Sequence, residues 1–405
     1  MTISLDDIEV PYGCYWTSPF ARWQGSLQHV HAMRLSAYTA KNELASRKID
    51  PLIFDTGVFG MTYAQYKSFY GAPWPLYEAG ATHTPGHMIT QVCATGVRVI
   101  FAAVSEIALG VSEKALVMTA DRSSNSTHMY YPAPAGPGGK GISEDQVMDN
   151  MTYDAIGGHA QLLSAENVAK KYGITTEHQH EVVLMRYAQY QDALADDRAF
   201  QKRFMTLPFS VPKHDLKRED KVMEGDEGIY QTTAEGLAGL KPVTEGGTVT
   251  FGGQTHPADG VGGMIVTTAE HSRELARDAS IRIRFRGFGQ ARVDLAYMPV
   301  APISSTKKAL DHAGISIKDI AAIKSHNPFA VNDIAFSKEM GVELSGINNY
   351  GCSLIWGHPN GVTAQRLIIE LIEELVIKGG GLGLFQGCAA GDSSMACIVE
   401  VGERK

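Results

Sequence analysis

The sequence predicts an α/β protein made of two similar halves with a lobe inserted between them. The main observation is that residues 36–123 and 305–393 share one order of helix and strand patterns, although they share little residue identity. In both stretches apolar strand patterns alternate with amphipathic helices, which is typical of mainly parallel sheets covered on both faces. The composition, 44% hydrophobic and 20% charged, is that of a globular protein with a large core.

Each stretch opens with an amphipathic helix and an apolar strand, then has a reactive residue directly before a second helix, and ends in another apolar strand. The segments of the first stretch are SAYTAKNELASRK, IDPLIFDTGVFG, ITQVCATGVRVIFAAVSEIALG and ALVMTADRSS. Those of the second are STKKALDHAG, ISIKDIAAIKSHNPFA, NNYGCSLIWGHPNGVTAQRLIIELIEEL and GLGLFQGCAAGDSS. This pattern indicates an internal duplication of one α/β unit.

The segment between the two stretches differs in composition. It carries the Pro/Gly-rich YYPAPAGPGGKGIS and a polar helical pattern, and strand patterns resume at GGTVTFG, GGMIVTTA and IRIRFRGFG. We expect these three strands to complete the sheet of the first half. The predicted domains are residues 1–122 with 246–298, an inserted lobe of residues 123–245, and residues 299–405.

Charge and cysteine content exclude several classes of protein. The net charge of -8 argues against a nucleic-acid-binding surface. The five cysteines are never spaced as C-x-x-C, so neither a disulfide framework nor a thiolate zinc site is indicated, and a reducing compartment fits. The N-terminus is acidic, and Ser105 and Glu106 interrupt the most apolar stretch. We therefore expect a cytoplasmic protein with no membrane span and no metal.

Two residues in corresponding positions of the halves are candidates for covalent chemistry. Cys93 stands where a strand pattern ends and an apolar helix begins, and the positive end of a helix dipole lowers a thiol pKa. His358 occupies the equivalent position in GHPNG. If the two helix N-termini meet across a pseudo-twofold axis, they supply a thiol and an imidazole. The alternatives are a buried core cysteine and a histidine that caps a helix.

Several blocks together resemble the thiolases, enzymes that make or cleave 3-ketoacyl-CoA. They are CATG around Cys93, SAENVAKKYGIT, AEGLAGLKPV, GGTVTFGGQTHPADG, HNPFAVNDIAF, GHPNG around His358 and GLFQGCAAG around Cys388. The resemblance covers almost the whole chain and implies the thiolase fold, a five-layered αβαβα core with an inserted lobe. It implies CoA as a substrate, with no metal or redox cofactor.

The resemblance assigns three roles by position. Cys93 is the nucleophile that becomes acylated, His358 activates it and donates to an oxyanion, and Cys388 is the acid and base that acts on the acetyl-CoA enolate and on incoming CoA. The alternative for Cys388 is a small core residue in a tight turn.

Two departures from the family pattern are present. His326 stands where classical thiolases have an Asn that helps form the first oxyanion hole, and a His there resembles the sterol-carrier-type and archaeal thiolases. Cys-x-Gly-x-Gly becomes Cys388-Ala389-Ala390-Gly391-Asp392. Ala390 lacks the freedom of glycine to adopt positive φ, so we expect an altered loop, and Asp392 adds a charge near the thioester.

CoA recognition and substrate are the least determined parts. Positive charge gathers in the lobe around Lys202, Arg203 and Lys213, which is either a CoA-binding surface or a solvated basic face, and we take Thr255 as a further CoA-binding candidate. The aromatic segments at 61–77 and 129–131 either line the acyl pocket or pack at an interface. A pocket would favour an aromatic or branched substrate, as in the benzoylsuccinyl-CoA thiolase large subunit.

Three questions on function and assembly remain open from the sequence. One rival is a condensing enzyme such as a 3-ketoacyl or hydroxymethylglutaryl-CoA synthase, against which Cys388 argues. Another is a non-catalytic acyl-CoA-binding subunit. The resemblance implies a homodimer or higher homo-oligomer, and its archaeal branch leaves open an accessory small subunit with zinc-ribbon and OB-fold parts.

Overall fold

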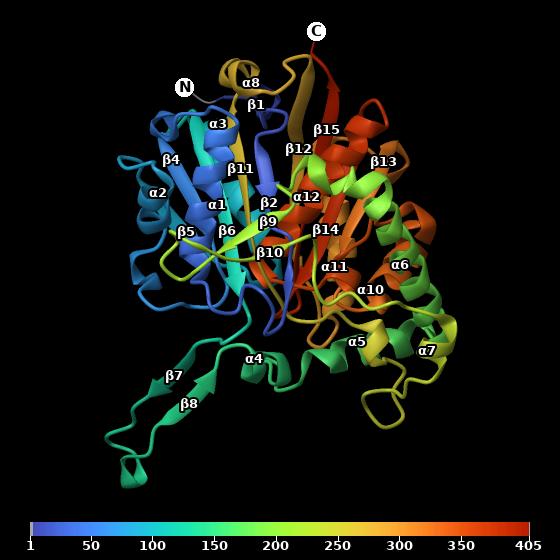
Figure 1. The fold of residues 1–405 in the computed structure, drawn as a ribbon. Helices are drawn as coiled ribbons and strands as arrows, with labels where there is room; N and C mark the ends of the chain where they lie inside the picture. Colours follow the sequence, from blue (N-terminus) through green and yellow to red (C-terminus); the bar gives the residue numbers. More distant parts are fainter. Residues whose placement is uncertain (1–2, 405) are drawn as a thin grey trace.

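The structure, a computed structural model, describes residues 3–404 and is dominated by one mixed sheet of eleven strands (Figure 1). The main path of the sheet has the order β13-β14-β15-β12-β1-β11-β6-β4-β5, with β2 and β3 paired to β11. Its strands are β1 (Ile8–Glu9), β2 (Tyr15–Thr17), β3 (Ala21–Arg22), β4 (Thr56–Gly60), β5 (Gly86–Ile89), β6 (Lys114–Arg122), β11 (Ala258–Thr268), β12 (Ile281–Arg292), β13 (Ile320–His326), β14 (Gly381–Ala389) and β15 (Ser393–Glu403).

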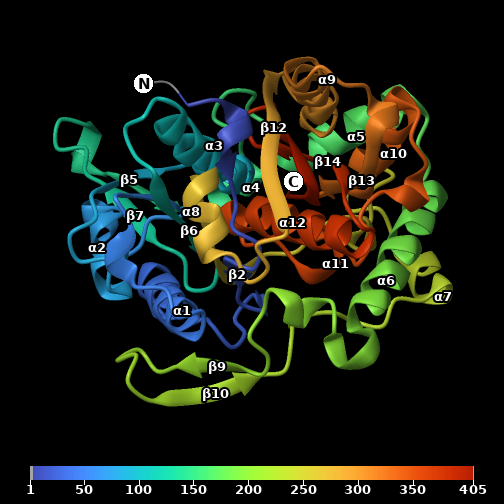
Figure 2. The same ribbon diagram turned by 90° about the horizontal axis from the view of Figure 1, so that it is seen from above.

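Helices and the two halves of this sheet form the five layers that the family resemblance implies (Figures 1 and 2). Helices α1 and α2 cover the outer face of the first half, α3 and α12 lie between the halves, and α9 and α10 cover the outer face of the second half. Their bounds are α1 (Ala32–Ser46), α2 (Pro73–Ala79), α3 (Thr95–Ala108), α9 (Ala301–Ala313), α10 (Ala330–Met340) and α12 (Asn360–Ile377), with the short α8 (Ala269–Leu275) and α11 (Ser353–Trp356) beside them.

Helix α12 in the central layer is buried along almost its whole length. A helix with this position must be apolar on all sides or have its charges paired. The charge of Arg366 on this helix is paired, since its guanidinium bonds Glu370 at 2.9 Å and Asp226 of the inserted lobe at 2.7 Å. The lobe is thereby fixed to the central layer.

The duplication is confirmed in the strand pairing. Strand β4 pairs parallel with β6, and β6 pairs antiparallel with β11. In the second half β13 pairs parallel with β14, and β14 pairs antiparallel with β15. The prediction of mainly parallel sheets is wrong, because long strands that return through turns or through the lobe pair antiparallel with their neighbours.

The three strand patterns that follow the lobe in the sequence form different structures. GGMIVTTA lies in β11 and completes the sheet of the first half as predicted. IRIRFRGFG lies in β12, which pairs with β15 of the second half, and GGTVTFG forms a 3-10 turn at Phe251–Gly253 instead of a strand. The expectation that IRIRFRGFG and GGTVTFG are strands of the first half is therefore wrong. The domain boundaries themselves stay predictions.

The inserted lobe contains a hairpin of β7 and β8 that projects away from the body (Figure 1). The elements of the lobe are β7 (His128–Tyr131), β8 (Ile142–Asp145), α4 (Met148–Thr152), α5 (Gln161–Tyr172), α6 (Thr176–Arg198), β9 (Phe209–Pro212), β10 (Glu219–Met223) and α7 (Ala234–Ala238).

None of the helices formed by residues 3–404 is long and apolar enough to cross a membrane.

Candidate active site

Cys93 lies in a single 3-10 turn, Val92–Ala94, that leads directly into α3. Val92, directly before the thiol, has φ of 48°, a strained conformation for a β-branched residue. Burial raises the pKa of the Cys93 thiol to about 12, although the backbone N–H groups of Ala390 and of Cys93 itself favour the thiolate. The prediction of a lowered thiol pKa is wrong, because desolvation outweighs the helix end. The thiol needs a base close by.

His358 lies in the connection between α11 and α12 and is 7% exposed. Its backbone N–H donates to the carbonyl of His256 at 2.9 Å, and its Nδ1 is hydrogen-bonded to the Thr363 hydroxyl at 2.6 Å. Burial, with the neighbouring His326 and His256, holds the pKa of the imidazole well below its usual value. The ring is therefore a neutral group whose Nε2 faces away from Thr363.

His326 is the last residue of β13 and is fully buried. Its Nδ1 is 2.8 Å from the Ser353 hydroxyl, and burial lowers the pKa of the imidazole to about 3. A hydroxyl can donate or accept, so both Ser353 and Thr363 permit either tautomer of the ring that they contact. Each histidine can therefore present either a proton or a lone pair at Nε2.

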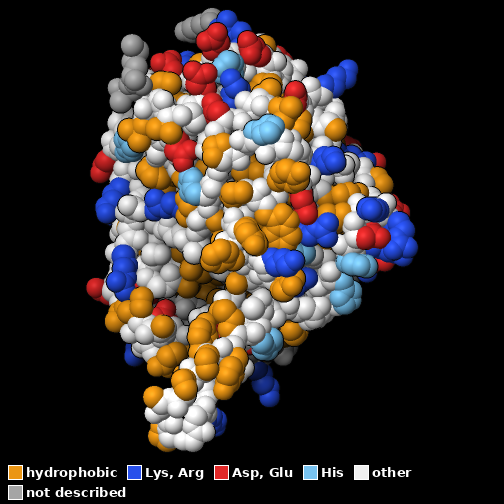
Figure 3. Space-filling view, turned by 90° about the vertical axis from the view of Figure 1, so that its left-hand side faces the viewer, with side chains coloured by type: hydrophobic (Ala, Val, Ile, Leu, Met, Phe, Trp, Pro, Cys, Tyr) orange, Lys and Arg blue, Asp and Glu red, His pale blue; other side chains and the backbone are white. Residues whose placement is uncertain are grey.

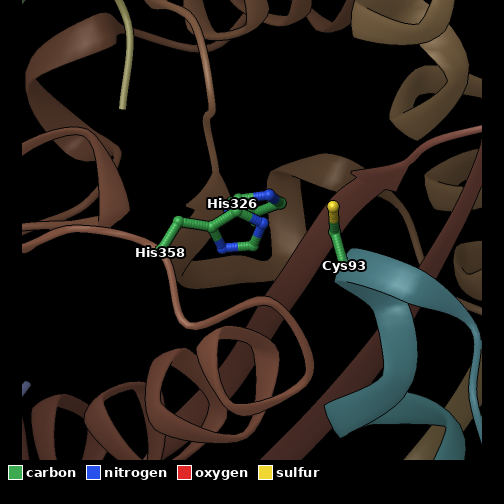
Figure 4. Close-up of side chains that lie close together, drawn as sticks. All are labelled: Cys93, His326 and His358. Atoms are coloured by element: carbon green, nitrogen blue, oxygen red, sulfur yellow. The ribbon is translucent and has the colours of Figure 1, made fainter. Parts of the chain in front are cut away.

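Cys93, His326 and His358 converge from three separate segments (Figure 4). One sulfur or nitrogen atom of each lies within 4.8 Å of the others, and the two rings stack with centroids 4.2 Å apart and planes inclined by 29°. Both Nε2 atoms are buried without a hydrogen-bond partner among the described residues. Unpartnered polar atoms in such a position indicate a place for a ligand atom.

The close approach of α3 and α12 explains this convergence. A Cβ on Gly96 would lie 2.5 Å from the backbone nitrogen of Gln365, so only glycine permits this contact of the helix starts. The predicted meeting of the two helix N-termini is confirmed.

The thiol and the two imidazoles form a group that can hold a small ligand. One sulfur and two nitrogen atoms are a ligand set that zinc accepts, and no sequence motif predicts this set because the three residues are far apart in the chain. Each unpartnered Nε2 atom can also donate a hydrogen bond to an oxygen atom, since the hydroxyl at Nδ1 permits that tautomer. The arrangement can thus hold an oxyanion beside the thiol.

Cys388 lies near the end of β14 and is fully buried. The Asn332 side chain of α10 donates to its sulfur at 3.3 Å. Burial raises the pKa of the Cys388 thiol, and the nearby Cys93 thiol raises it further. Two protonated thiols therefore lie on the same site.

The loop after Cys388 has its left-handed residues directly after Ala390. Positive φ occurs at Gly391 (79°) and Asp392 (54°), whereas Ala390 does not adopt it. The Asp392 carboxylate accepts the N–H of Ala296 at 3.2 Å and of Tyr297 at 3.0 Å. This carboxylate is therefore bound to the connection between β12 and α9, and its effect on the thioester stays a prediction.

Asp121, at the end of β6, is a residue of the site that the sequence reasoning did not single out. Its carboxylate accepts the N–H of Thr62 at 2.9 Å, Tyr63 at 3.0 Å and Gly361 at 2.7 Å. Burial raises the pKa of this carboxyl to about 6. An aspartate that ends the apolar strand ALVMTAD was the signal available in the sequence.

Of the four CoA-binding candidates, the structure places only Thr255 beside the histidines. The Thr255 hydroxyl donates to the Ser353 carbonyl at 2.6 Å. Arg203 pairs with the buried Glu373 at 2.5 Å, and Lys202 pairs with Asp197 at 2.5 Å. Because Glu373 is near the far end of α12, roughly 20 Å along the helix from His358, Arg203 lies well away from the thiol.

Lys213, the fourth candidate, lies after β9 at the turn of the β9–β10 hairpin, where its N–H donates to the Arg218 carbonyl at 2.8 Å. This turn is likewise outside the group formed by the thiol and the imidazoles.

The predicted aromatic segments are mostly on the surface. Tyr66, Tyr70, Tyr130 and Tyr131 are exposed, and Phe69 is 95% exposed. These side chains do not enclose an acyl pocket in the single chain, so they do not support an aromatic substrate.

Comparisons with known proteins cover almost the whole chain. The family models for the N-terminal and C-terminal domains of thiolase match residues 16–270 and 279–401. The acetyl-CoA acetyltransferase of Allochromatium vinosum is 27% identical over 95% of this chain and 96% of its own length. The human mitochondrial 3-ketoacyl-CoA thiolase is 27% identical, again over 95% of this chain and 96% of its own length.

Solved structures lead to the same result. A crystal structure of the human mitochondrial 3-ketoacyl-CoA thiolase superposes with a TM-score of 0.89 at 26% identity, covering 98% of this chain and 99% of that one. A second, of the same enzyme with CoA, has a TM-score of 0.88 at 26% identity and covers 98% of each chain. The fold, in which a thiol lies beside two imidazoles, is that of an acyltransferase. The chain belongs to the thiolase family.

Proposed function

We propose that this protein cleaves a 3-ketoacyl-CoA with free CoA, or runs the reverse Claisen condensation, through an acyl group on Cys93. The observation that carries the proposal is the convergence of the Cys93 thiol with the two unpartnered Nε2 atoms of His326 and His358. Relatives named acetyl-CoA acetyltransferase and 3-ketoacyl-CoA thiolase, and the CoA complex of one of them, support it.

In the first half-reaction the Cys93 sulfur attacks the 3-keto carbon while its proton passes to Nε2 of His358. The resulting oxyanion accepts hydrogen bonds from His358 and from Nε2–H of His326. The bond between the second and third carbons then breaks, and its electron pair moves to the leaving acetyl-CoA enolate. The Cys388 thiol protonates that carbon, so that an acyl-Cys93, a Cys388 thiolate and an acyl-CoA product remain.

In the second half-reaction the Cys388 thiolate takes the proton of the CoA thiol, and the CoA sulfur attacks the acyl-Cys93 thioester. The new oxyanion lies where the N–H groups of Ala390 and Cys93 face the Cys93 sulfur. Collapse of this intermediate releases the Cys93 thiolate, which regains its proton from His358. CoA serves as a substrate, and this chemistry uses no cofactor or metal.

The proposed substrate is a 3-ketoacyl-CoA, and within this class we propose an acyl group that is aromatic or branched, such as benzoylsuccinyl. The exposed Ile156 of the lobe lies against Gly391, next to the loop that carries Cys388, and is the support for an apolar group at the entrance. Steady-state thiolysis with acetoacetyl-CoA, a long-chain 3-ketoacyl-CoA and benzoylsuccinyl-CoA measures this preference directly.

CoA itself we place with its thioester at Cys93, past Thr255, and with its nucleotide toward the basic surface that includes Lys202 and Lys213. We propose only a minor role for Arg203 in CoA binding, because its guanidinium is already paired with the Glu373 carboxylate. Lys202→Ala with Lys213→Ala should raise KM for CoA and leave kcat unchanged. A changed kcat with an unchanged KM would contradict this placement.

For the assembly we propose a homodimer that forms through the edge strand β5. This strand ends the sheet, and unpaired strand edges with apolar side chains tend to pair. Exposed aromatic side chains of the 66–77 segment gather on the same side of the molecule, where Figure 3 shows hydrophobic side chains. Light scattering should give a dimer mass for the wild type and a monomer mass for Phe69→Glu with Tyr70→Glu.

We also propose an accessory small subunit. Co-expression with the neighbouring reading frame tests it, and full activity of this chain alone without stimulation would contradict it.

We further propose a cytoplasmic location. The cysteines support it, since all five are unpaired thiols within residues 3–404.

The decisive experiment is mass spectrometry of the protein after mixing with acetyl-CoA. An acetyl adduct on Cys93, removed by added CoA, is expected. No adduct, together with no thiolysis of any 3-ketoacyl-CoA, would favour the non-catalytic acyl-CoA-binding alternative. A condensing activity that survives loss of Cys388 would favour the synthase-like alternative.

A further inference from the structure

Asp121 joins the two halves of the molecule at the site. It ends β6 of the first half, and it is 1% exposed. Oδ1 accepts the N–H groups of Thr62 and Tyr63, at 2.9 and 3.0 Å, and Oδ2 accepts that of Gly361 at 2.7 Å. Gly361 is in the first turn of α12, three residues after His358. One carboxylate thus bonds the first half to the segment that carries the imidazole.

The packing around this carboxylate is tight. A Cβ on Gly361 would lie 2.9 Å from Oδ2 of Asp121 and 3.2 Å from Thr95, the first residue of α3 after the Cys93 turn. The start of α12 is therefore pressed against both Asp121 and the start of α3. A carboxylate is also the favoured partner for the unsatisfied N–H groups at a helix start.

A second bond supports the same connection. The Asn360 side chain donates to the Tyr63 hydroxyl at 2.6 Å. Tyr63 is therefore connected to the segment that carries His358 in two ways, directly through this bond and indirectly through Asp121. The Asp121 charge is close enough to Cys93 to raise the pKa of its thiol. Asp121 therefore lies beside both groups of the thiol and imidazole pair without belonging to it.

We propose that Asp121 is a positioning residue that sets the separation of the His358 imidazole from the Cys93 thiol. This rests on the proposed function for its effect on turnover, but its effect on the thiol is independent of the reaction. A misplacement of about 1 Å in a reacting pair costs up to about 100-fold in rate.

The test uses Asp121→Asn, which changes one bond selectively. The amide oxygen can still accept the N–H groups of Thr62 and Tyr63, whereas the amide nitrogen would face the N–H of Gly361, two donors without an acceptor. The matched control is Asp259→Asn. Asp259 is also 1% exposed, and burial also raises its carboxyl pKa to about 6, but it accepts the N–H of Ser124 instead of the histidine segment.

Two measurements are made on both variants: kcat and KM for acetoacetyl-CoA thiolysis, and the alkylation rate of Cys93 by iodoacetamide followed by mass spectrometry. For Asp121→Asn we expect kcat to fall about 10- to 100-fold with KM nearly unchanged, and Cys93 alkylation to slow. Asp259→Asn should keep both rates. Loss of the charge alone would lower the thiol pKa and speed alkylation, so faster alkylation would overturn the proposal.

Equal losses in both variants would show a merely structural role and would also overturn it. If Asp121→Asn does not fold, Tyr63→Phe removes only the hydroxyl that Asn360 contacts and should lower kcat and alkylation in the same direction by a smaller factor. Unchanged rates in Tyr63→Phe would then contradict the proposal. If wild-type thiolysis is absent, the proposed function fails, and the alkylation rates still test Asp121.

Discussion

The imidazole of His326 stacks on that of His358, with ring centroids 4.2 Å apart, and each ring is held at Nδ1 by a hydroxyl. Stacked imidazoles repel each other when both are charged, and burial keeps the pKa of each far below its usual value. The pair is therefore neutral before substrate binds.

Cys93→Ser should abolish acyl transfer and leave the fold intact. A hydroxyl has a far higher pKa than a thiol, and the site already raises the thiol pKa to about 12. Turnover of purified protein with an unchanged circular dichroism spectrum is the measurement. Retention of more than about one hundredth of wild-type kcat would indicate another nucleophile.

Cys388→Ala should separate the two half-reactions. Cys93 should still be acylated by a reactive thioester, because His358 and His326 remain, whereas thiolysis and condensation both slow for lack of a proton donor. Acyl-Cys93 measured by mass spectrometry should therefore accumulate. Normal thiolysis by this variant would remove Cys388 from the mechanism.

His326→Asn should lower kcat more than it raises KM. The shorter amide leaves the first oxyanion without its direct Nε2 donor, and removal of one such donor costs about 100- to 1,000-fold in the general case. An intervening water can restore part of the bond, so we expect a loss of about 10- to 100-fold, with a larger loss in His326→Ala. Equal rates in the wild type and in both variants would show that His326 does not contact the oxyanion.

The same variant should change how stability depends on pH. The unfolded chain protonates His326 near its ordinary pKa of about 6.5, whereas the folded protein does so near 3. The unfolded state thus binds more protons between these values, and the stabilisation present above about pH 6.5 is lost as the pH falls toward 3. From pH 7 to 5 the wild type should lose about 2 kcal/mol more than His326→Asn.

Buried carboxyls act in the opposite direction over part of this range. Burial raises the pKa of Asp121 and of Asp259 to about 6, so each stabilises the fold below its unfolded pKa and this contribution is lost as the pH rises to 6. The two aspartates are present in both proteins and cancel in the comparison. Urea unfolding at pH 7 and 5 measures the difference, and an equal decrease in both proteins would contradict a neutral buried His326.

Much of the fold and site is encoded in local patterns. The repeated order of helix and strand predicts two similar halves, and helix starts at Cys93 and His358 predict that a thiol and an imidazole meet. These features follow from residue periodicity and chain order, which are local properties, and the motif blocks identify the family.

Other features depend on contacts between distant segments. Strand β12 pairs along its length with β15 of the second half, and no local pattern distinguishes that partner from β6. The Cys93 thiol pKa is raised because its surroundings are dry, which outweighs a helix end visible in the sequence. Asp121 reaches Gly361 across 240 positions of the chain, and the Asp392 carboxylate accepts the N–H of Ala296. Burial, pairing partner and side-chain direction are set by packing, so they arise only when the chain has folded.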